Sequence, residues 1–279
     1  MIKNLKSFIS NQAEILFLAC LGLAASLDVW RILSVYKTSW GLNSMRVTNS
    51  IFYFLQGPLT ESSTTLYVLA AVFAASILLL ILTPLKRTFF ALNFAAYFLF
   101  ISFYLFHITY EDHRAAVITL MYSLCAIPIF MQQKKWSENI WKALFFGIVL
   151  FYFAAGVEKI LKSGFAWLNG TTLQILIFHE GQSYREVLSP LLKDVQLAKK
   201  AQLAALLVEL LAPLALFKRI RSLWLVIIIG FHANLELFFN FKYYYVGGLT
   251  FVVTMIAISK ELAFFKYPHP KSEPNPLEL

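Results

Sequence analysis

Charged residues are scarce in this chain. Only 14% of its 279 residues are charged, 24 basic and 15 acidic, whereas soluble domains carry about 25%. Together with 59% hydrophobic residues and a mean hydropathy of +0.68, this scarcity argues against a soluble globule, a disordered protein or a nucleic-acid-binding module. Cysteine is scarce as well. Cys20 and Cys125 both fall inside apolar runs, so we expect two buried free thiols and no disulfide framework.

Long hydrophobic runs dominate the sequence instead. Eight of them reach the roughly 17–25 residues that a helix needs to cross the hydrocarbon core of a bilayer. We therefore predict an all-α integral membrane protein, a bundle of about eight transmembrane helices within residues 1–266, followed by a disordered tail over 267–279. The predicted spans are 14–36, 65–84, 88–109, 114–132, 140–161, 199–217, 222–241 and 243–262.

The basic residues predict the orientation of these spans. With the N-terminus inside, 13 lysines and arginines fall on the inner side and nine on the outer side, so the positive-inside rule places both termini in the cytoplasm. Lys3 and Lys6 before the first run resemble a signal peptide, but no small-x-small site follows, and we expect an uncleaved helix. Two apolar segments in outer loops, 51–55 and 167–178, are too short to cross, and we expect them to be re-entrant or flat on the outer face.

Ionisable residues inside the predicted spans are the candidates for function. Each costs about 2.5–3.5 kcal/mol to insert, and such groups usually face a cavity. Asp28 and Arg31, three residues apart on one helix face, are predicted to form an internal ion pair. The other candidates are Glu158, Lys159, Glu209, His232 and Glu236 within spans, and His107, Glu111, Asp112 and His113 at the turn between the third and fourth spans.

Two of these candidates leave alternatives open. Glu209 either bonds to a neighbouring helix or accepts protons. His232 and Glu236, spaced i and i+4, either bond to each other or contribute to a metal site with His107 and His113. A lone HxxxE is a weak metal signal, because a site needs three or more ligands, and no metal is expected.

Four ionisable groups are predicted to share one depth near the outer face. The span over 140–161 runs from inside to outside, which puts Lys159 in its outer turns. The span over 222–241 runs the same way, so His232 falls in its outer half, and His107 and His113 lie at an outer turn. This shared depth indicates a functional cavity, and snorkelling of charged groups toward the interface is the alternative.

Lys159 is the most distinctive of the four. The small residues Ala154, Ala155 and Gly156 just before it allow another helix to approach closely. A lysine taken out of water favours its neutral form, and a neutral amine is able to act as a general base. The alternative is that Lys159 snorkels outward or pairs with Glu158, which lies about 100° away around the helix, a poor geometry for a direct pair.

The residues around Lys159 resemble a known signature. Phe-Tyr-Phe-Ala-Ala-Gly-Val-Glu-Lys over 151–159, followed by Trp-Leu-Asn-Gly over 167–170, is similar to the motif of vitamin K-dependent γ-carboxylase and of the bacterial HTTM (horizontally transferred transmembrane) family. Phe231-His232 and the aromatic stretch to Tyr245 resemble the Phe-His segment of that family. The segments 207–213 and 218–221 resemble the part before it, and His113 is similar in place to a second histidine of the family.

The resemblance implies a function and a cofactor. Lys159 would be the base that deprotonates a reduced, vitamin K-type quinone, after which reaction with O2 gives an epoxide and a base strong enough to start carboxylation of a substrate by CO2. His113 and His232 would be catalytic, and Trp167, Glu209, Glu236 and His107 would bind the cofactor. The partners expected are the lipid bilayer and a secreted peptide or protein on the outer face of a bacterial cytoplasmic membrane.

The sequence also departs from that family. Glu158 stands where animal carboxylases have lysine, and nothing after the last predicted span corresponds to their large lumenal β-rich region. The resemblance therefore implies the quinone chemistry more directly than peptide carboxylation. The alternative function is a non-enzymatic membrane component that assists maturation, export or immunity of a secreted peptide, as in peptide-toxin systems.

Overall fold

The part of the chain that the computed structural model describes is helical and contains no strand. It covers residues 2–39, 63–82, 86–107, 113–133, 135–180, 185–239 and 244–265. The elements are α1 (Ile2–Asn11), α2 (Ala13–Ser39), α3 (Ser63–Leu82), α4 (Lys86–His107), α5 (His113–Phe130), α6 (Glu138–Ser163), η2 (Gly164–Leu168), α7 (Thr171–Glu180), α8 (Arg185–Lys193), α9 (Val195–Leu210), η4 (Ala212–Leu216), α10 (Lys218–Phe239) and α11 (Tyr244–Ser259).

The prediction of an all-α chain is confirmed for these residues, and the described part of each predicted apolar run lies in helices or the residues beside them, but eight membrane-spanning helices are not shown. Two helical stretches within the described residues are both long and apolar enough to cross a membrane, Ala13–Trp30 and Glu138–Leu168. The shorter apolar helices are Tyr67–Leu79, Phe90–Ile101, Val117–Phe130 and Val246–Ser259. The predicted segment 51–55 and the tail 267–279 lie outside the described residues.

One predicted span is wrong as a single helix. The run over 199–217 divides into α9, which ends at Leu210, and the short 3-10 helix η4. Pro213 explains the division, because proline has no N–H to bond the carbonyl of Glu209 and its ring clashes with that carbonyl. The 16 residues of α9 extend over only about 24 Å, which is less than the hydrocarbon core of a bilayer.

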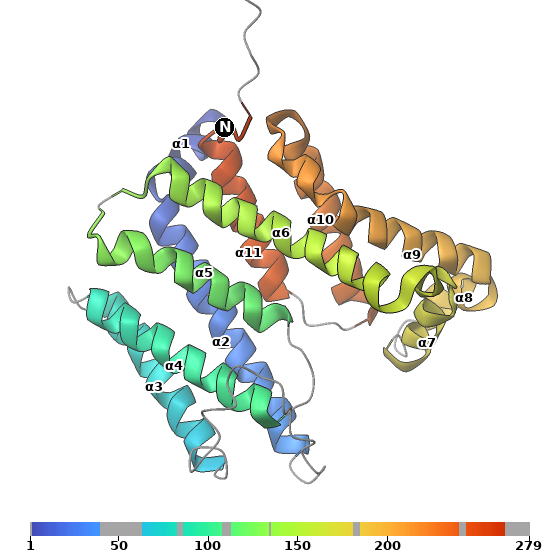
Figure 1. Ribbon diagram of the computed structural model, residues 1–279, viewed down its shortest axis with the longest axis horizontal. Coiled ribbons are helices and arrows are strands. Elements are labelled where there is room, and N and C mark those ends of the chain that lie inside the picture. The colour runs from blue at the N-terminus through green and yellow to red at the C-terminus, as the bar shows by residue number, and fades with distance from the viewer. Residues whose placement is uncertain are drawn as a thin grey trace, which may run out of the picture.

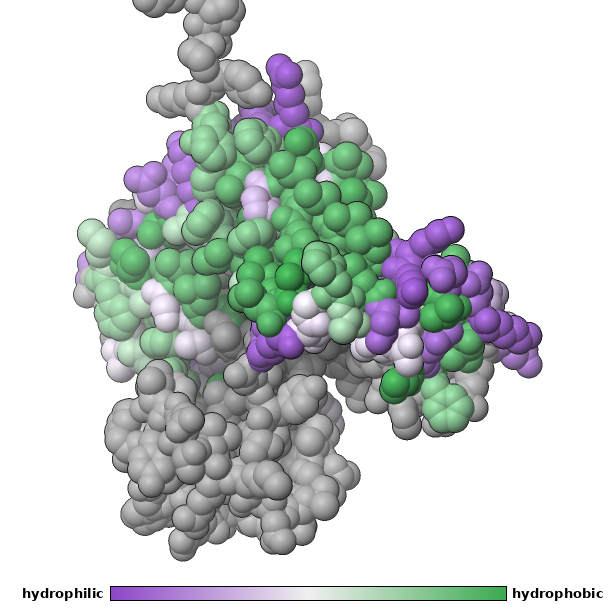
Figure 2. Space-filling view, turned by 45° about the vertical axis from the view of Figure 1, so that its right-hand side comes forward, coloured by the Kyte–Doolittle hydropathy of each residue, from purple (hydrophilic) through white to green (hydrophobic). Residues whose placement is uncertain are grey.

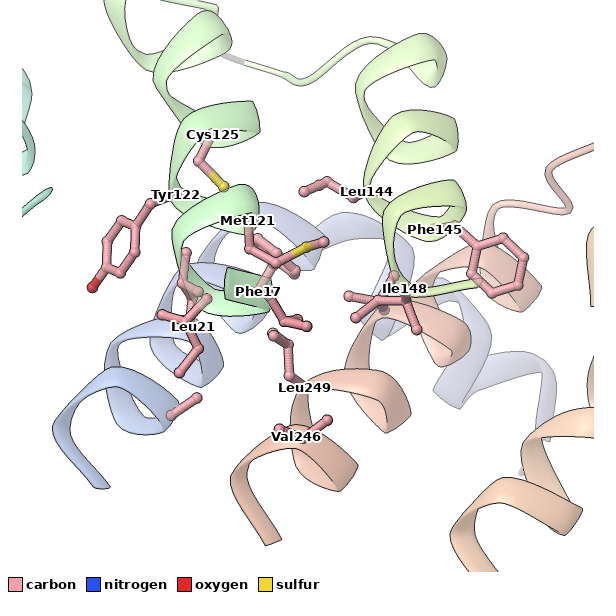
Figure 3. Close-up of a cluster of buried hydrophobic side chains, with 14 of the residues drawn as sticks. Phe17, Leu21, Met121, Tyr122, Cys125, Leu144, Phe145, Ile148, Val246 and Leu249 are labelled. Atoms are coloured by element: carbon pink, nitrogen blue, oxygen red, sulfur yellow. The ribbon is translucent and has the colours of Figure 1, made fainter. Parts of the chain in front are cut away.

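Helices α2, α5, α6 and α11 surround the main core (Figure 1; Figure 3). Phe17 and Leu21 of α2 lie one helical turn apart, as do Leu144 and Ile148 of α6, so each pair presents one apolar stripe to the centre. Cys125 of α5 is buried in this core as a free thiol, which confirms its prediction, whereas Cys20 is free but only half-buried. Helices α3 and α4 pack together beside α2, and α7 and α8 lie at the opposite end of the molecule (Figure 1).

Buried polar side chains join α4 to α2, α3 and α5. Tyr97 of α4 donates its hydroxyl to Asp28 Oδ2 at 3.0 Å, and Tyr122 of α5 donates to Asn93 Oδ1 at 2.7 Å. The Asn93 amide in turn donates to Ser76 Oγ of α3 at 3.0 Å. Asp28 therefore has a partner on another helix, whereas the side chain of Arg31, its predicted partner, is not among those described. Such bonds offset the cost of burying polar groups among apolar ones.

Arg221, near the start of α10, ties the ends of two other helices together. Its side chain is buried, and its guanidinium donates to backbone carbonyls only: Nε to Ala215 O at 3.2 Å, Nη2 to Leu216 O at 3.2 Å, and Nη1 to Leu262 O at 2.7 Å and Ala257 O at 3.5 Å. These carbonyls belong to η4, to α11 and to the residues after α11. One side chain thus bonds to carbonyls at the ends of both helices, where the intrahelical pattern runs out, although Ala257 O also accepts the N–H of Leu262.

Candidate functional site

One face of α6 carries the candidate site. Tyr152, Gly156 and Lys159 are spaced by four and three residues, so their side chains lie above one another along the same side of the helix. The helix ends at Gly164, whose φ of 55° is a left-handed conformation that glycine adopts without steric cost. Helices α9, α10 and α11 supply the partners of this face.

Gly156 allows α9 to approach α6 closely. A Cβ atom at this position would lie 3.0 Å from Glu209 Cβ and 3.1 Å from Leu210 Cδ2, so a larger residue would push the two helices apart. The prediction that small residues before Lys159 admit a neighbouring helix is therefore confirmed, and the neighbour is the turn of α9 that carries Glu209.

Lys159 and Glu209 form an ion pair across this contact. Lys159 Nζ lies 2.5 Å from both carboxylate oxygens of Glu209, in a bidentate arrangement. The side chain of Glu209 is only 9% exposed and that of Lys159 is 30% exposed, so the pair is largely withdrawn from solvent. Glu158 pairs instead with Lys162, one turn further along α6. An ammonium group held this closely by a carboxylate is able to exchange a proton with it.

The loop after α6 places an aromatic ring beside this pair. Lys159 Nζ lies 5.7 Å from the centre of the Trp167 ring, within reach of a cation–π interaction. Three residues later, Gly170 donates its N–H to Gln202 Oε1 of α9 at 2.7 Å. Gly170 has a φ of 86°, and a Cβ there would lie 2.6 Å from Val195 O, so only glycine fits. The spacing from Trp167 to Gly170 thus anchors the loop to α9 and holds the indole near Lys159.

His232 of α10 contacts the same face of α6 two turns before Lys159. Its Nε2 lies 2.5 Å from the hydroxyl of Tyr152, and that hydroxyl lies 3.0 Å from Thr250 Oγ1 of α11. Tyr152 and Thr250 are buried, and His232 is half-buried. Lys159 and His232, predicted from the sequence to share one depth, are therefore both connected to one helix face.

The remaining predicted site residues are placed less fully. His113 begins α5 and His107 ends α4, but the side chains of His107, His113 and Glu236 are not among those described. Within the described residues, no group of three or more His, Cys, Asp or Glu side chains is arranged to hold a metal ion. The proposed metal ligation by these residues therefore has no support from the described side chains.

Three residues of this region were not predicted from the sequence. Tyr152 bonds to both His232 and Thr250, and Gln202 holds the Gly170 loop. For Tyr152 the sequence did contain a signal: it lies seven residues before Lys159, and this spacing places both residues on one helix face. Thr250 and Gln202 carry no such signal, since their partners are 98 and 32 residues away in the sequence.

No protein-family model, no curated protein and no solved structure matches this chain. Any statement about function therefore depends on its own residues and on their geometry.

Replacing Gly156 with alanine is expected to lower the free energy of unfolding by about 1–3 kcal/mol, because the added methyl group overpacks the α6–α9 contact. Gly230 is the matched control: it also lies in a helix, but a Cβ there meets nothing within 4 Å. Gly230→Ala is expected to be neutral or to stabilise by up to about 1 kcal/mol through helix propensity. Thermal unfolding of both variants in one detergent measures the difference, and equal midpoints would contradict the close contact.

Proposed function

We propose that this chain is an integral membrane enzyme, similar to the membrane part of vitamin K-dependent γ-carboxylase and to HTTM proteins, in which Lys159 is the base that activates a reduced quinone. The observation that carries the proposal is the largely buried Lys159–Glu209 pair beside Trp167, on the helix face that also bonds His232 through Tyr152. Supporting it is the match of Lys159, Trp167 and Gly170 to the signature of that family.

A membrane location accounts for the surface of the molecule. Figure 2 shows a broad, nearly continuous face of hydrophobic side chains bordered by hydrophilic ones. Large exposed apolar residues lie on the outward sides of helices, such as Phe146 and Leu150 of α6 and Leu223 and Val226 of α10. Soluble proteins rarely expose apolar patches of this kind. We propose that the apolar runs cross a bacterial cytoplasmic membrane, the run over 199–217 as α9 continued by η4, with cytoplasmic termini and the Lys159 region near the outer face.

The side chains around Lys159 suit a quinone. A quinone is a planar ring with oxygen atoms at its edge. The indole of Trp167 offers a flat face on which such a ring would stack, and the nitrogen of Lys159 would contact one of its oxygen atoms. When bound, a reduced quinone would supply, with O2, the strong base that removes a carbon-bound proton from a substrate before CO2 adds to it. Burial of the site matters for this chemistry, because water would quench a strong base.

The chain's own residues divide the work at this site. Glu209 holds the Lys159 ammonium through both carboxylate oxygens and accepts its proton when the ring binds, which leaves a neutral amine. The Lys159 amine then takes the hydroxyl proton of the bound ring. Trp167 covers the amine, and the Gly170–Gln202 bond holds the loop of Trp167 in place.

The decisive experiment incubates the purified chain with a chemically reduced naphthoquinone under O2 and detects the quinone epoxide by mass spectrometry. The wild-type protein is expected to form epoxide in proportion to its concentration. Lys162→Met, which removes an exposed lysine three residues beyond Lys159, is expected to form epoxide at the same rate and serves as the matched control. Absence of epoxide from the wild-type protein would reject the quinone reaction.

A second candidate function also has an observation in its favour. A lysine held by both oxygens of a carboxylate is well suited to join two helices permanently, which is a structural role. The chain would then assist maturation, export or immunity of a secreted peptide without turning over a quinone. This candidate predicts no epoxide from the wild-type protein, so the same experiment separates the two.

A further inference from the structure

Three side chains from three helices meet at one hydroxyl group. The phenol oxygen of Tyr152 on α6 lies 2.5 Å from Nε2 of His232 on α10 and 3.0 Å from Oγ1 of Thr250 on α11. Tyr152 is 3% exposed and Thr250 is 0% exposed, so water does not compete for these bonds. The phenol is thus the common partner of a histidine and a threonine in a dry setting.

Elementary chemistry gives this chain of bonds a direction. The phenol is a stronger acid than an imidazole N–H, and an imidazole nitrogen lone pair is a stronger base than a phenol oxygen, so Tyr152 donates its proton toward His232 Nε2. The Thr250 hydroxyl then donates to the Tyr152 oxygen, and donation into a phenol oxygen strengthens its own O–H as a donor. In a neutral imidazole one nitrogen accepts and the other carries the hydrogen. The hydrogen of His232 is therefore on Nδ1.

The packing around His232 keeps the ring in this orientation. A Cβ at Gly247 of α11 would lie 3.2 Å from Cγ of His232, so the imidazole sits directly against a backbone that has no side chain. The ring centres of Tyr152 and His232 are 5.8 Å apart with an edge-to-face angle of 72°, and Trp224 packs on the other side of Tyr152 at 5.7 Å. Side chains and backbone from several helices therefore hold the Tyr152–His232 contact in one arrangement.

We propose that Tyr152, aimed by Thr250, is a positioning residue that holds His232 as the Nδ1–H tautomer. In this tautomer Nδ1 carries the hydrogen and Nε2 is held by Tyr152, so His232 has no nitrogen available to accept a proton. The tautomer follows from these contacts and from the relative acidities of the groups, whereas its role in the quinone reaction rests on the proposed function.

Nitrogen NMR of the full-length protein in detergent micelles, labelled with ¹⁵N-histidine, tests the tautomer. His232→Gln identifies the two signals of this ring among those of the five histidines. The wild-type protein is expected to show hydrogen on Nδ1 and none on Nε2. Tyr152→Phe and Thr250→Val are expected to shift the His232 signals toward a mixture of tautomers, and Thr250→Ser is expected to restore the wild-type pattern.

A matched control separates this effect from the loss of any buried hydroxyl. Tyr97→Phe removes a buried tyrosine bond to Asp28 on other helices, and it is expected to leave the His232 signals unchanged. Hydrogen on Nε2 in the wild-type protein, or a Tyr152→Phe spectrum identical to that of the wild type, overturns the proposal.

Quinone turnover tests the role of the tautomer in the reaction. If the wild-type protein forms epoxide, Tyr152→Phe is expected to lower kcat by roughly tenfold or more with little change in KM, because the substrate still binds but His232 is no longer held in one tautomer. Full kcat in a variant whose tautomer is lost overturns the positioning role. If the wild-type protein forms no epoxide, the proposed function fails, while the NMR result still decides the tautomer.

Discussion

Arg221→Met is expected to lower the free energy of unfolding by at least about 4 kcal/mol. The substitution takes the guanidinium away from the carbonyls of Ala215, Leu216 and Leu262, whereas Ala257 O keeps the N–H of Leu262, and each buried acceptor without a partner costs about 1–3 kcal/mol. It also removes the stacking of the guanidinium on Phe145, whose ring centre lies 4.8 Å from Arg221 Cζ. A loss of this size approaches the whole stability of many proteins, about 5–15 kcal/mol.

Two further variants show whether geometry or charge is responsible. Arg219→Met changes an exposed arginine two residues earlier and is expected to alter stability by no more than about 0.5 kcal/mol. Arg221→Lys keeps the charge but loses the planar fork that reaches carbonyls of both η4 and the end of α11, so it is expected to be nearly as destabilising as Arg221→Met. Thermal unfolding in one detergent compares the three. Equal stability of Arg221→Met and Arg219→Met would contradict the role of Arg221.

The helices were predictable because long apolar runs have few structural alternatives. Inside a bilayer a run that approaches 20 residues satisfies its backbone hydrogen bonds only as a helix, and the described part of each run is mainly helical here, with a break in the run over 199–217. The break at Pro213 was not predicted, although proline inside a helical pattern was the visible signal. The amphipathic α1 was missed because it is short and polar on one side, and runs of apolar residues do not reveal such helices.

The partner of Lys159 was not predictable from the sequence. Local spacing draws attention to Glu158, whereas the structure pairs Lys159 with Glu209, 50 residues away. Periodicity assigns a residue to a helix face, but it does not say which other helix packs on that face. Gly156 indicated the place on α6 where another helix packs, because a small residue allows a close approach. The neighbouring helix is α9, at the turn that carries Glu209. The site could be located on α6 from the sequence, but its partners required the packing of the helices.

The second large effect concerns the stability of the Lys159–Glu209 pair. Lys159→Met is expected to destabilise the protein by about 3 kcal/mol, because it leaves the carboxylate of Glu209 buried without its counter-ion. Replacing both residues with methionine removes the charge that must be desolvated, so the double variant is expected to be close to the wild type in stability. Thermal unfolding of the two single variants and the double variant measures this coupling. A double variant whose loss equals the sum of the two single losses would contradict a direct pair.

Turnover in the same variants then separates the structural role of the pair from its chemical role. If Lys159 is the base, the loss of epoxide formation is expected to be at least about 100-fold in Lys159→Met, and the double variant is expected to be equally inactive although its stability is restored. If the pair only joins α6 to α9, activity follows stability and returns in the double variant. Glu209→Gln keeps the shape of the side chain but does not take up the lysine proton. If Glu209 accepts this proton during turnover, epoxide formation is expected to fall as far in Glu209→Gln as in Lys159→Met. Equal activity of the double variant and the wild type would reject Lys159 as the base.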